Sequence, residues 1–319
     1  MKTLLIAALA CAAACGAQAQ TYPTQPITFV VPFPPGGTSD VLARRVGQKI
    51  GDYTKQSVVI ENVAGASTII GAERVAKARP TGYQFLVATS TTVSTNPHLF
   101  RKLPYRLDDF EPVALLAQHP LAVVVSSKLT AKTFPEFVSY ARTVSGGVAY
   151  ASTGRGGISE VLGEMMKAEF RMPMRDIPYR GSAPAVAAIL SGEVDLHFDG
   201  ITSTLPLYRA GKLKVVAVTG RERILAAPEL PTLVEFGYRD LVMGNIYVLL
   251  APKGTPRAAI EAVNGLVKRA LDEPDLQKWL IEQGVTPTAL TPEGVGRLIE
   301  ADSAFMAKIV RELKIPPVD

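Results

Sequence analysis

The stretch FVVPFPPGGTSDVLARR, residues 29–45, joins an apolar run to a helical pattern through a turn of prolines and glycines. The apolar residues Ile27–Val31 predict a buried strand, which the prolines after it bring to an end. Beyond Gly36 and Gly37, apolar residues recur at spacings of three and four from Val41 to Tyr53, and this period predicts an amphipathic helix. A strand, a tight turn and a helix in this order are typical of the first half of a βαβ unit.

The same alternation continues along the chain and predicts an α/β fold with largely parallel strands. We expect strands at residues 27–31, 57–61, 84–88, 121–125, 147–150, 195–199, 214–218 and 247–251. Helices are expected at 41–53, 68–78, 134–143, 159–170 and 183–191, and in several segments from 256 to 313. No flexible Ser/Gly or Pro linker divides the chain, so two domains would be joined by ordered strands.

The composition is that of a globular protein, with 47% hydrophobic and 20% charged residues among 319. The formal net charge of +5 is scattered, without the cationic stripe and interleaved aromatics that nucleic-acid binding needs. We therefore expect no nucleic-acid partner, and a mildly basic protein is compatible with a small anionic ligand.

The N-terminus has the pattern of a secretory signal peptide, with Lys2, an apolar run at residues 4–14 and the small-x-small tripeptide Ala17-Gln18-Ala19. We expect cleavage near Ala19 and a mature chain that begins near Gln20, outside the cytoplasm. Beyond the leader, no segment approaches the ~20 apolar residues of a membrane-spanning helix.

Both cysteines, Cys11 and Cys15, lie in this leader, so the mature chain has no thiol for a disulfide, a metal or a nucleophile. Lipid attachment at Cys15 is the alternative to free export, although the usual upstream leucine is missing. The histidines His98, His119 and His197 show no HExxH spacing, and we expect no metal and no cofactor.

The opening turn has a partial echo, because GGTSDVLA at residues 36–43 matches GGISEVLG at 156–163 in most positions. A helix N-terminus offers unpaired N–H groups and the positive end of the macrodipole, so both turns suit a carboxylate or a phosphate. Neither turn has the lysine of GxxxxGK[ST], which favours a carboxylate over a phosphate. The alternative is that each Gly-Gly sequence only forms a tight turn between strand and helix and binds no ligand.

Two further loops gather short polar side chains that suit a small polar ligand. ATSTTVSTNPH at residues 88–98 and YRGSAP at 179–184 are both expected after strands. Arg155 suits a second anionic group or an aromatic face of the ligand, and Asp199 suits a ligand amino or hydroxyl group unless it caps a turn. No serine stands in a GxSxG elbow, so a binding protein is favoured, with a hydrolase using Ser90 or Ser182 as the alternative.

Several collinear blocks closely resemble the Bug-type substrate-binding receptors of tripartite tricarboxylate transporters. They are YPTQPITFVVPFPPGGTSDVLARR at residues 22–45, the long segments 71–117 and 177–219, PTLVEFGY at 231–238 and LLAPKGTP at 249–256. The resemblance spans nearly the whole mature chain.

This resemblance implies a periplasmic solute receptor with the two-domain periplasmic-binding-protein fold, type II-like, whose cleft closes on a small organic acid. It places the first domain at residues 20–120 plus 246–319 and the second at 121–245, with crossings near Gln118–Val123 and Gly244–Tyr247. It implies no catalysis, membrane permease subunits as partners, and a monomer. Dicarboxylates, tricarboxylates, acidic amino acids and aromatic acids all remain possible ligands, and a sensor for a signalling partner is the alternative role.

The resemblance also implies the site residues. On one side the ligand carboxylate is held by Phe33, Pro34, Pro35, Gly36, Gly37, Thr38 and Asp40. On the other side it is held by Ser152, Thr153, Gly154, Gly156 and Gly157, with Arg155 beside them. Specificity contacts are expected from Ser90, Thr92, Asn96, Tyr179, Gly181, Ser182, Ala183 and Asp199.

The chain departs from the usual pattern of these receptors in three places. The loop at residues 64–69 differs in sequence, so we expect it to line the cleft differently. Arg155 and Glu160 stand where a small or amide residue and a histidine are common. Ile246 or Tyr247 occupies a region where tryptophan is frequent, which predicts a reshaped pocket wall.

Overall fold

The computed structural model describes residues 22–154, 156–285 and 287–318. The expected leader and Arg155 lie outside the described residues. The described strands form one mixed sheet in the order β2-β1-β3-β9-β4-β7-β5-β6, with β8 paired to β4. Their bounds are β1 Ile27–Val31, β2 Val58–Asn62, β3 Gln84–Thr89, β4 Phe110–Val125, β5 Val148–Ser152, β6 Met174–Pro178, β7 Leu196–Gly200, β8 Lys214–Val218 and β9 Gly244–Pro252.

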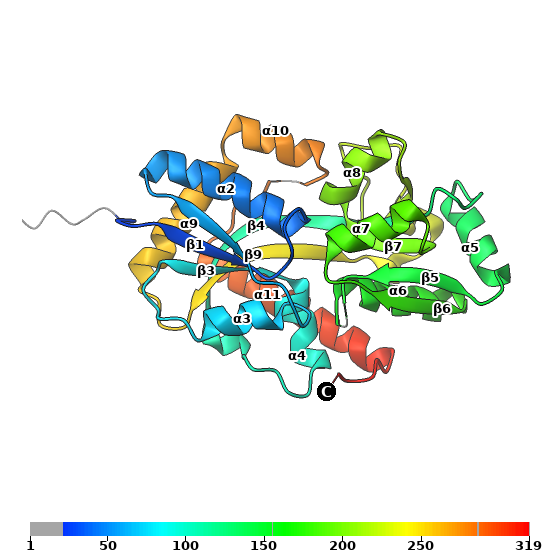
Figure 1. Ribbon diagram of the computed structural model, residues 1–319, viewed down its shortest axis with the longest axis horizontal. Coiled ribbons are helices and arrows are strands. Elements are labelled where there is room, and N and C mark those ends of the chain that lie inside the picture. The colour runs from blue at the N-terminus through cyan, green and yellow to red at the C-terminus, as the bar shows by residue number, and fades with distance from the viewer. Residues whose placement is uncertain (1–21, 155, 286, 319) are drawn as a thin grey trace, which may run out of the picture.

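The long strand β4 passes through two parts of this sheet. Its residues Phe110–Pro120 pair with β9, and its residues Leu121–Val125 pair with β7, with β8 along the other side. We call β1, β2, β3, β9 and the start of β4, with their helices, the first lobe, and β5–β8 and the end of β4, with theirs, the second lobe. Figure 1 shows the two lobes side by side, with β4 and β9 running between them.

The expected parallel pairing holds among β1, β2 and β3 and among β5, β6 and β7, but not for the pairs that involve β4 or β9. Strand β1 is parallel to β2 and β3, and β5 is parallel to β6 and β7. Strands β4 and β9 are antiparallel to their described neighbours, because one carries the chain into the second lobe and the other carries it back.

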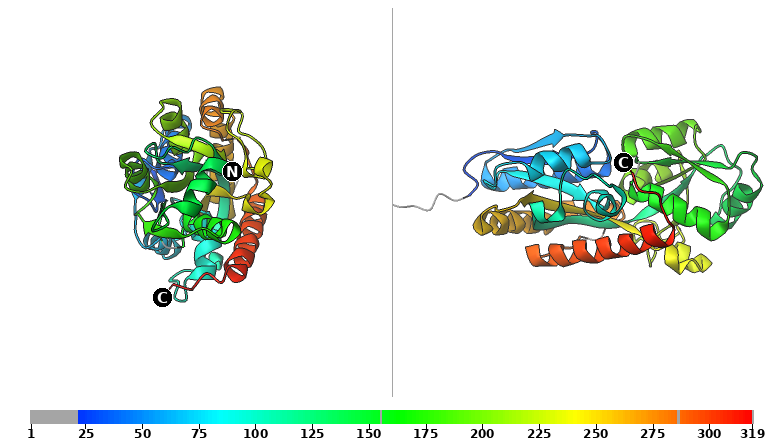
Figure 2. Two further views of the ribbon diagram at one scale, coloured as in Figure 1. Left: turned by 90° about the vertical axis from the view of Figure 1, so that its right-hand side faces the viewer. Right: turned by 90° about the horizontal axis from the view of Figure 1, so that it is seen from below.

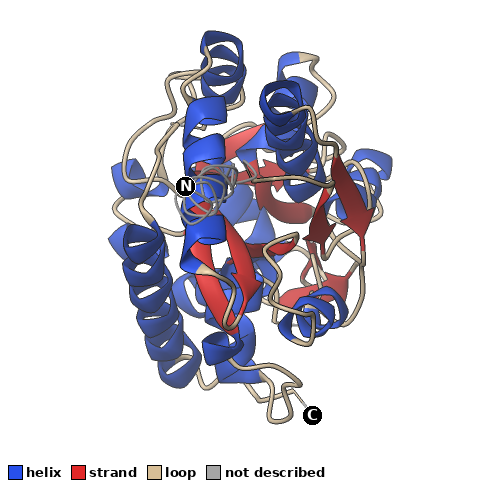
Figure 3. Cartoon of the chain, turned by 90° about the vertical axis from the view of Figure 1, so that its left-hand side faces the viewer, coloured by secondary structure: helices blue, strands red, loops and turns tan. Residues whose placement is uncertain are grey.

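Helices cover both faces of each part of the sheet. They are α2 Thr38–Thr54, α3 Ile69–Ala76, α4 Asn96–Leu99, α5 Phe134–Thr143, α6 Ile158–Phe170, α7 Ser182–Ser191, α8 Ile201–Arg209, α9 Arg257–Leu271, α10 Pro274–Glu282 and α11 Pro292–Glu312. A π-helical turn, η2, spans Thr91–Thr95, and 3₁₀ turns span Leu107–Asp109 (η3), Leu233–Phe236 (η4) and Arg239–Leu241 (η5). Figure 3, seen from the first-lobe end, shows helices on both sides of the strands.

Each part of the sheet has a core on both faces. In β1, Phe29 lies in the core on one face and Val30 in the core on the other. In the second lobe, Val123 of β4 likewise lies in the core on one face and Val124 in the core on the other. Alternate side chains of a strand point to opposite faces, so a continuous apolar run requires cover on both sides.

The last helix, α11, connects the cores of the two lobes. Val295 and Ile299 near its start pack in a core of the first lobe, whereas Met306 and Ile309 near its end pack in a core of the second lobe. In the right panel of Figure 2 this helix runs along one side of the molecule toward the second lobe. None of the described helices is both long and apolar enough to span a membrane.

Two second-lobe elements and part of β4 were not expected from the sequence. Strand β6 has the sequence MRDIP and is largely uncovered, so it lacks an apolar run. Helix α8 contains Pro206 and a cluster of hydroxyl residues, which hide its apolar period. The expected strand at 121–125 is only the end of β4, because Pro112 and Pro120 interrupt the earlier pattern.

Candidate ligand-binding site

Four helices begin where the two lobes meet, and each follows a glycine. Helix α2 of the first lobe follows Gly37, and α6, α7 and α8 of the second lobe follow Gly157, Gly181 and Gly200. None of these N-cap positions offers a side-chain oxygen to the first turn of its helix. Because the first N–H groups of a helix have no partner inside it, these helix ends present donors and positive potential to one region.

A small cavity of about 40 Å³ lies at this meeting point. A buried water needs about 10–15 Å³ of such space, so the cavity has room for roughly three or four waters or a ligand group of that size. The residues that line it come from both lobes and from all four helix N-termini. They are Phe33, Pro34, Gly37, Thr38, Ser39, Thr89, Thr91, Leu121, Thr153, Ile158, Ser182, Ala183, Phe198, Asp199, Gly200, Asn245 and Tyr247.

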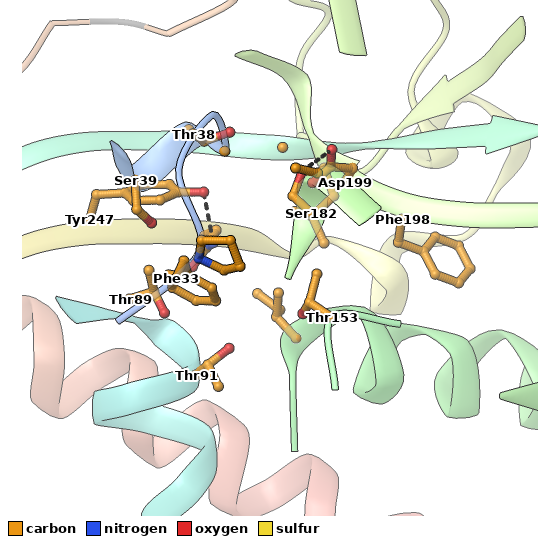
Figure 4. A pocket seen from close by; sticks show the side chains of 17 residues that line it. Phe33, Thr38, Ser39, Thr89, Thr91, Thr153, Ser182, Phe198, Asp199 and Tyr247 are labelled. Atoms are coloured by element: carbon orange, nitrogen blue, oxygen red, sulfur yellow. Dashed lines mark hydrogen bonds between the residues drawn. The ribbon is translucent and has the colours of Figure 1, made fainter. Parts of the chain in front are cut away.

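The first lobe presents Thr38, Thr89 and Tyr247 to the cavity. Figure 4 shows them opposite Ser182 and Asp199 of the second lobe. The hydroxyl of Thr89 is buried without a hydrogen-bond partner in the described part of the chain, although buried hydroxyls are normally paired. Burial, helped by the nearby Asp199 carboxylate, raises the pKa of Tyr247, so its phenol stays protonated at neutral pH and is available to donate.

Asp199 is the one charged residue among the described residues that line the cavity. Its side chain is 5% exposed. Its Oδ2 accepts hydrogen bonds from the hydroxyls of Ser182 at 2.7 Å and Ser203 at 2.6 Å. Nε2 of His197 lies 3.8 Å from the same oxygen. The first turns of α7 and α8 thus hold this carboxylate at the edge of the cavity.

The two glycine turns share an internal hydrogen bond. The N–H of Gly36 donates to Asp40 Oδ2 at 3.0 Å, and the N–H of Gly156 donates to Glu160 Oε2. Burial alone would raise the pKa of Asp40, but hydrogen bonds from Arg44 and two neighbouring groups outweigh it and hold the pKa below its ordinary value. Each carboxylate therefore binds its own turn.

The lobes touch each other around the cavity. The hydroxyl of Thr38 lies 3.5 Å from that of Ser203 across the lobe junction. A Cβ on Gly181 of the second lobe would lie 3.2 Å from Pro34 of the first. The two lobes are therefore in direct contact at the edge of the cavity.

A second cavity of about 170 Å³ adjoins the first, and part of the predicted site lines both. The loop at residues 64–68 forms one wall of it, so this loop does line the cleft. Residues 66–68 have φ between 45° and 77°, a strained left-handed conformation for three residues with side chains. Hydrogen bonds from Thr92 and Asn96 to the hydroxyl of Thr68 support this conformation.

The predicted site residues fall into four groups. Those that line the central cavity are Phe33, Pro34, Gly37, Thr38, Thr153, Ser182, Ala183 and Asp199. Those that line only the adjoining cavity are Gly154, Tyr179 and Gly181. Those outside both linings are Pro35, Gly36, Asp40, Ser90, Thr92, Asn96, Ser152, Gly156 and Gly157. Arg155 lies outside the described residues.

Sequence reasoning missed several lining residues that lie at the ends of strands. Thr89 is the last residue of β3, and Asn245 lies at the start of β9. Asn245 accepts a hydrogen bond from the backbone N–H of Ser90 at 3.2 Å and donates one to the hydroxyl of Tyr247 at 3.0 Å. The position of β9 beside β3 in the sheet was the missing information.

Among the described residues, neither of the predicted loop serines, Ser90 and Ser182, forms a hydrogen bond to a histidine. The hydroxyl of Ser182 donates to Asp199, and the hydroxyl of Ser90 accepts from the backbone of Ile246. The ring nitrogens of His119 and His197 that form hydrogen bonds contact backbone carbonyl groups. Within the described ranges, no group of His, Cys, Asp and Glu side chains is arranged to hold a metal ion.

A mixed α/β sheet shared by two lobes, with a cavity between them, defines the class of the periplasmic binding proteins. The chain belongs to the TctC family, the tripartite tricarboxylate transporter family receptors, whose model matches residues 42–315. It is a solute-binding receptor of that family.

Individual relatives agree with this assignment. BugT of Bordetella pertussis is 32% identical over 296 residues, covering 92% of this chain and 91% of the relative. The structure of MatC (Rpa3494) from Rhodopseudomonas palustris with bound malate is 31% identical, with a TM-score of 0.86 over 91% of this chain and 100% of that one. The structure of R. palustris Rpa4515 with adipate is 31% identical, with a TM-score of 0.90 over 93% and 100%.

Proposed function

We propose that this receptor captures a small organic acid between its two lobes and delivers it unchanged to the membrane permease of a tripartite transporter. The observation that carries the proposal is the convergence of four glycine-capped helix N-termini on one small cavity. Anions bind at such helix ends because N–H donors and the macrodipole both favour negative charge.

The charges around the cavity suit one carboxylate group. Each helix N-terminus carries roughly half a positive charge, so four of them supply about two. Asp199, the charged residue of the described lining, offsets about one of these. Asp40 and Glu160, in the first turns of α2 and α6, offset part of the remainder, so the helix ends suit no more than one ligand carboxylate. The unpaired hydroxyl of Thr89 is placed to donate to it.

The ligands of the relatives support this class of ligand. MatC has bound malate and Rpa4515 has bound adipate, and both are small organic acids. Malate carries a hydroxyl group and adipate does not, yet both proteins are 31% identical to this chain. Overall similarity therefore does not decide whether the ligand has a hydroxyl group.

We propose further that the two lobes are the two domains, with boundaries at 20–120 plus 246–319 and at 121–245, and that they open by bending β4 and β9. This is supported by the pairing of β4, which changes partner from β9 to β7 at Pro120 and Leu121. Ligand entry then requires a hinge motion of the kind common in binding proteins. We expect the protein to be exported to the periplasm. We also expect it to be a monomer, which size-exclusion chromatography would check.

The experiment is a thermal-shift screen of organic acids, followed by calorimetry on each acid that binds and on its amide. A ligand that binds only the folded protein raises its melting temperature. We expect the acid to bind and the amide to bind far more weakly, because the amide lacks the charge that the helix ends favour. Equal affinity for acid and amide would contradict the proposed site.

Thr89→Val provides a sharper test of the same cavity. Valine has nearly the shape of threonine but lacks the hydroxyl, so we expect weaker acid binding with little change in folding. Thr130→Val, at an exposed position of the second lobe, is the matched control. If both variants bound the acid like the unaltered protein, Thr89 would not contact it.

A further inference from the structure

The side chain of Asp199 uses only one of its two oxygens in the described hydrogen bonds. Both of its hydrogen bonds, from Ser182 and Ser203, end on Oδ2. No described group donates to Oδ1, and this atom is not among the fully buried polar atoms that lack a partner. Because Asp199 lines the cavity, Oδ1 is available as an acceptor there.

The described cavity wall holds hydroxyl and amide groups but no cation to pair with this oxygen. Among the described residues that line the cavity there is no lysine or arginine, and Nε2 of His197 lies 3.8 Å from Oδ2. The hydroxyl of Ser182 already donates to Oδ2. A carboxylate oxygen that a bound ligand covers without donating to it loses its water and gains nothing in return.

We infer that the ligand carries, beside its carboxylate, a protonated amine or a hydroxyl group that donates a hydrogen bond to Oδ1 of Asp199. The inference rests on the proposed function and narrows its ligand to amino acids and hydroxy acids. A plain diacid with its second carboxylate at this point is disfavoured, because two carboxylates repel each other. An amine gains more than a hydroxyl, since its hydrogen bond to the carboxylate is also an ion pair.

The test compares ligands that share one carbon frame. The series are succinate, L-malate and L-aspartate; glutarate, 2-hydroxyglutarate and L-glutamate; propionate, L-lactate and L-alanine; and 3-phenylpropionate, 3-phenyllactate and L-phenylalanine. Calorimetry on the full mature chain gives the dissociation constants. In each series that binds, we expect the amino or hydroxy member to bind about tenfold or more tightly than the unsubstituted acid.

The outcomes separate this inference from the function on which it rests. Binding of unsubstituted acids with equal or higher affinity would overturn the inference and leave the proposed function standing. Failure of every acid to bind would overturn the proposed function itself. The wild-type comparison needs no variant, so it does not depend on how a substitution folds.

The variant Asp199→Asn tests the role of Oδ1 directly. The asparagine oxygen can accept from Ser182 and Ser203 as Oδ2 does now, which turns the NH₂ group toward the cavity. An acceptor is thereby replaced by a donor, and we expect the preference for amino and hydroxy acids to be lost or reversed.

The control Asp240→Asn removes the same charge at an exposed position of the second lobe. It is expected to leave the preference unchanged. If Asp199→Asn folded and kept the wild-type preference, Oδ1 would not contact the ligand.

Discussion

The turn at residues 33–40 and the turn at residues 152–160 are closed by the same kind of hydrogen bond, but different groups stabilise each turn. In each, a glycine N–H donates to a carboxylate four residues later. The first turn is also held from outside, because Asn62 of β2 donates to the carbonyl of Phe33 and to Asp40, both at 3.0 Å. The second turn has bonds within itself, from the N–H of Thr153 to the hydroxyl of Ser159 at 2.8 Å.

The two turns also differ in what surrounds their glycines. A Cβ on Gly36 would meet nothing within 4 Å, whereas a Cβ on Gly156 would lie 3.0 Å from Phe100 and 3.3 Å from Asn96 of the other lobe. Gly36 therefore has no close neighbour, whereas Gly156 forms part of the contact between the lobes. The two turns are similar in sequence, but their glycines have different surroundings in the structure.

The largest effect should come from removing the carboxylate of the first turn. Asp40→Ala leaves the Gly36 N–H, Arg44 and Asn62 without their acceptor, so we expect the free energy of unfolding to fall by about 3 kcal/mol. Urea unfolding measures it. Asp40→Asn, which keeps one acceptor oxygen, should lose clearly less, and a loss below about 1 kcal/mol for Asp40→Ala would show that the turn does not need this carboxylate.

The glycines test the difference in surroundings. Gly36 and Gly156 both have left-handed φ angles, +90° and +73°, so alanine at either position strains the backbone by about 1 kcal/mol. Gly156→Ala additionally pushes against the first lobe, and we expect it to weaken acid binding about tenfold more than Gly36→Ala. Calorimetry with the acid found in the screen measures both. Equal affinities would mean that the lobes do not close on Gly156.

The hydrogen bonds that Asn62 and Ser159 make to the two turns should differ less in their contribution to the free energy of unfolding. Asn62→Ala removes two hydrogen bonds to the first turn and should cost about 1.5 kcal/mol of unfolding free energy. Ser159→Ala removes an acceptor of the second turn and should cost about 1 kcal/mol. The double variant Asp40→Asn/Asn62→Ala should lose less than the sum of its parts, because the two residues share a bond. If the two losses in unfolding free energy simply added, the hydrogen bond between Asn62 and Asp40 would be contradicted.

The smallest effect is a dependence on pH. The pKa of Asp40 is lower in the folded protein than in the unfolded chain, so its stabilising contribution is complete above the unfolded value and is lost as the pH falls through the folded value. The unaltered protein should therefore lose more stability between pH 7 and pH 3 than Asp40→Asn does. Parallel stability curves for the two proteins would contradict the lowered pKa.

The local patterns of the chain predicted much of the fold. The strand Ile27–Val31, the helix after Gly37 and the helix Phe134–Thr143 follow from apolar runs and periods that need only neighbouring residues. The α/β class and the receptor family are confirmed. Strand β6 and helix α8 were missed because their own sequences are polar or broken by proline, and only packing against the rest of the lobe stabilises them.

The site was predictable in outline but not residue by residue. Thr38, Ser182 and Asp199 line the cavity as the loops after their strands suggested. Asp40 and Glu160 bind their own turns, and Thr89 and Asn245 meet at the cavity only because β3 pairs with β9. Long-range strand pairing of this kind leaves no local signal.

The sequence by itself determined the two glycine turns, the helices that follow them and the receptor family, because each depends on short-range spacing or on long collinear similarity. Only the tertiary structure decided which carboxylate faces the ligand cavity. Asp40 and Glu160 follow the glycines of these turns in similar sequences, and Asp199 precedes Gly200 at the start of α8. Asp40 and Glu160 accept from N–H groups inside their turns, whereas Asp199 lines the cavity and accepts from hydroxyls of two helices through one of its oxygens.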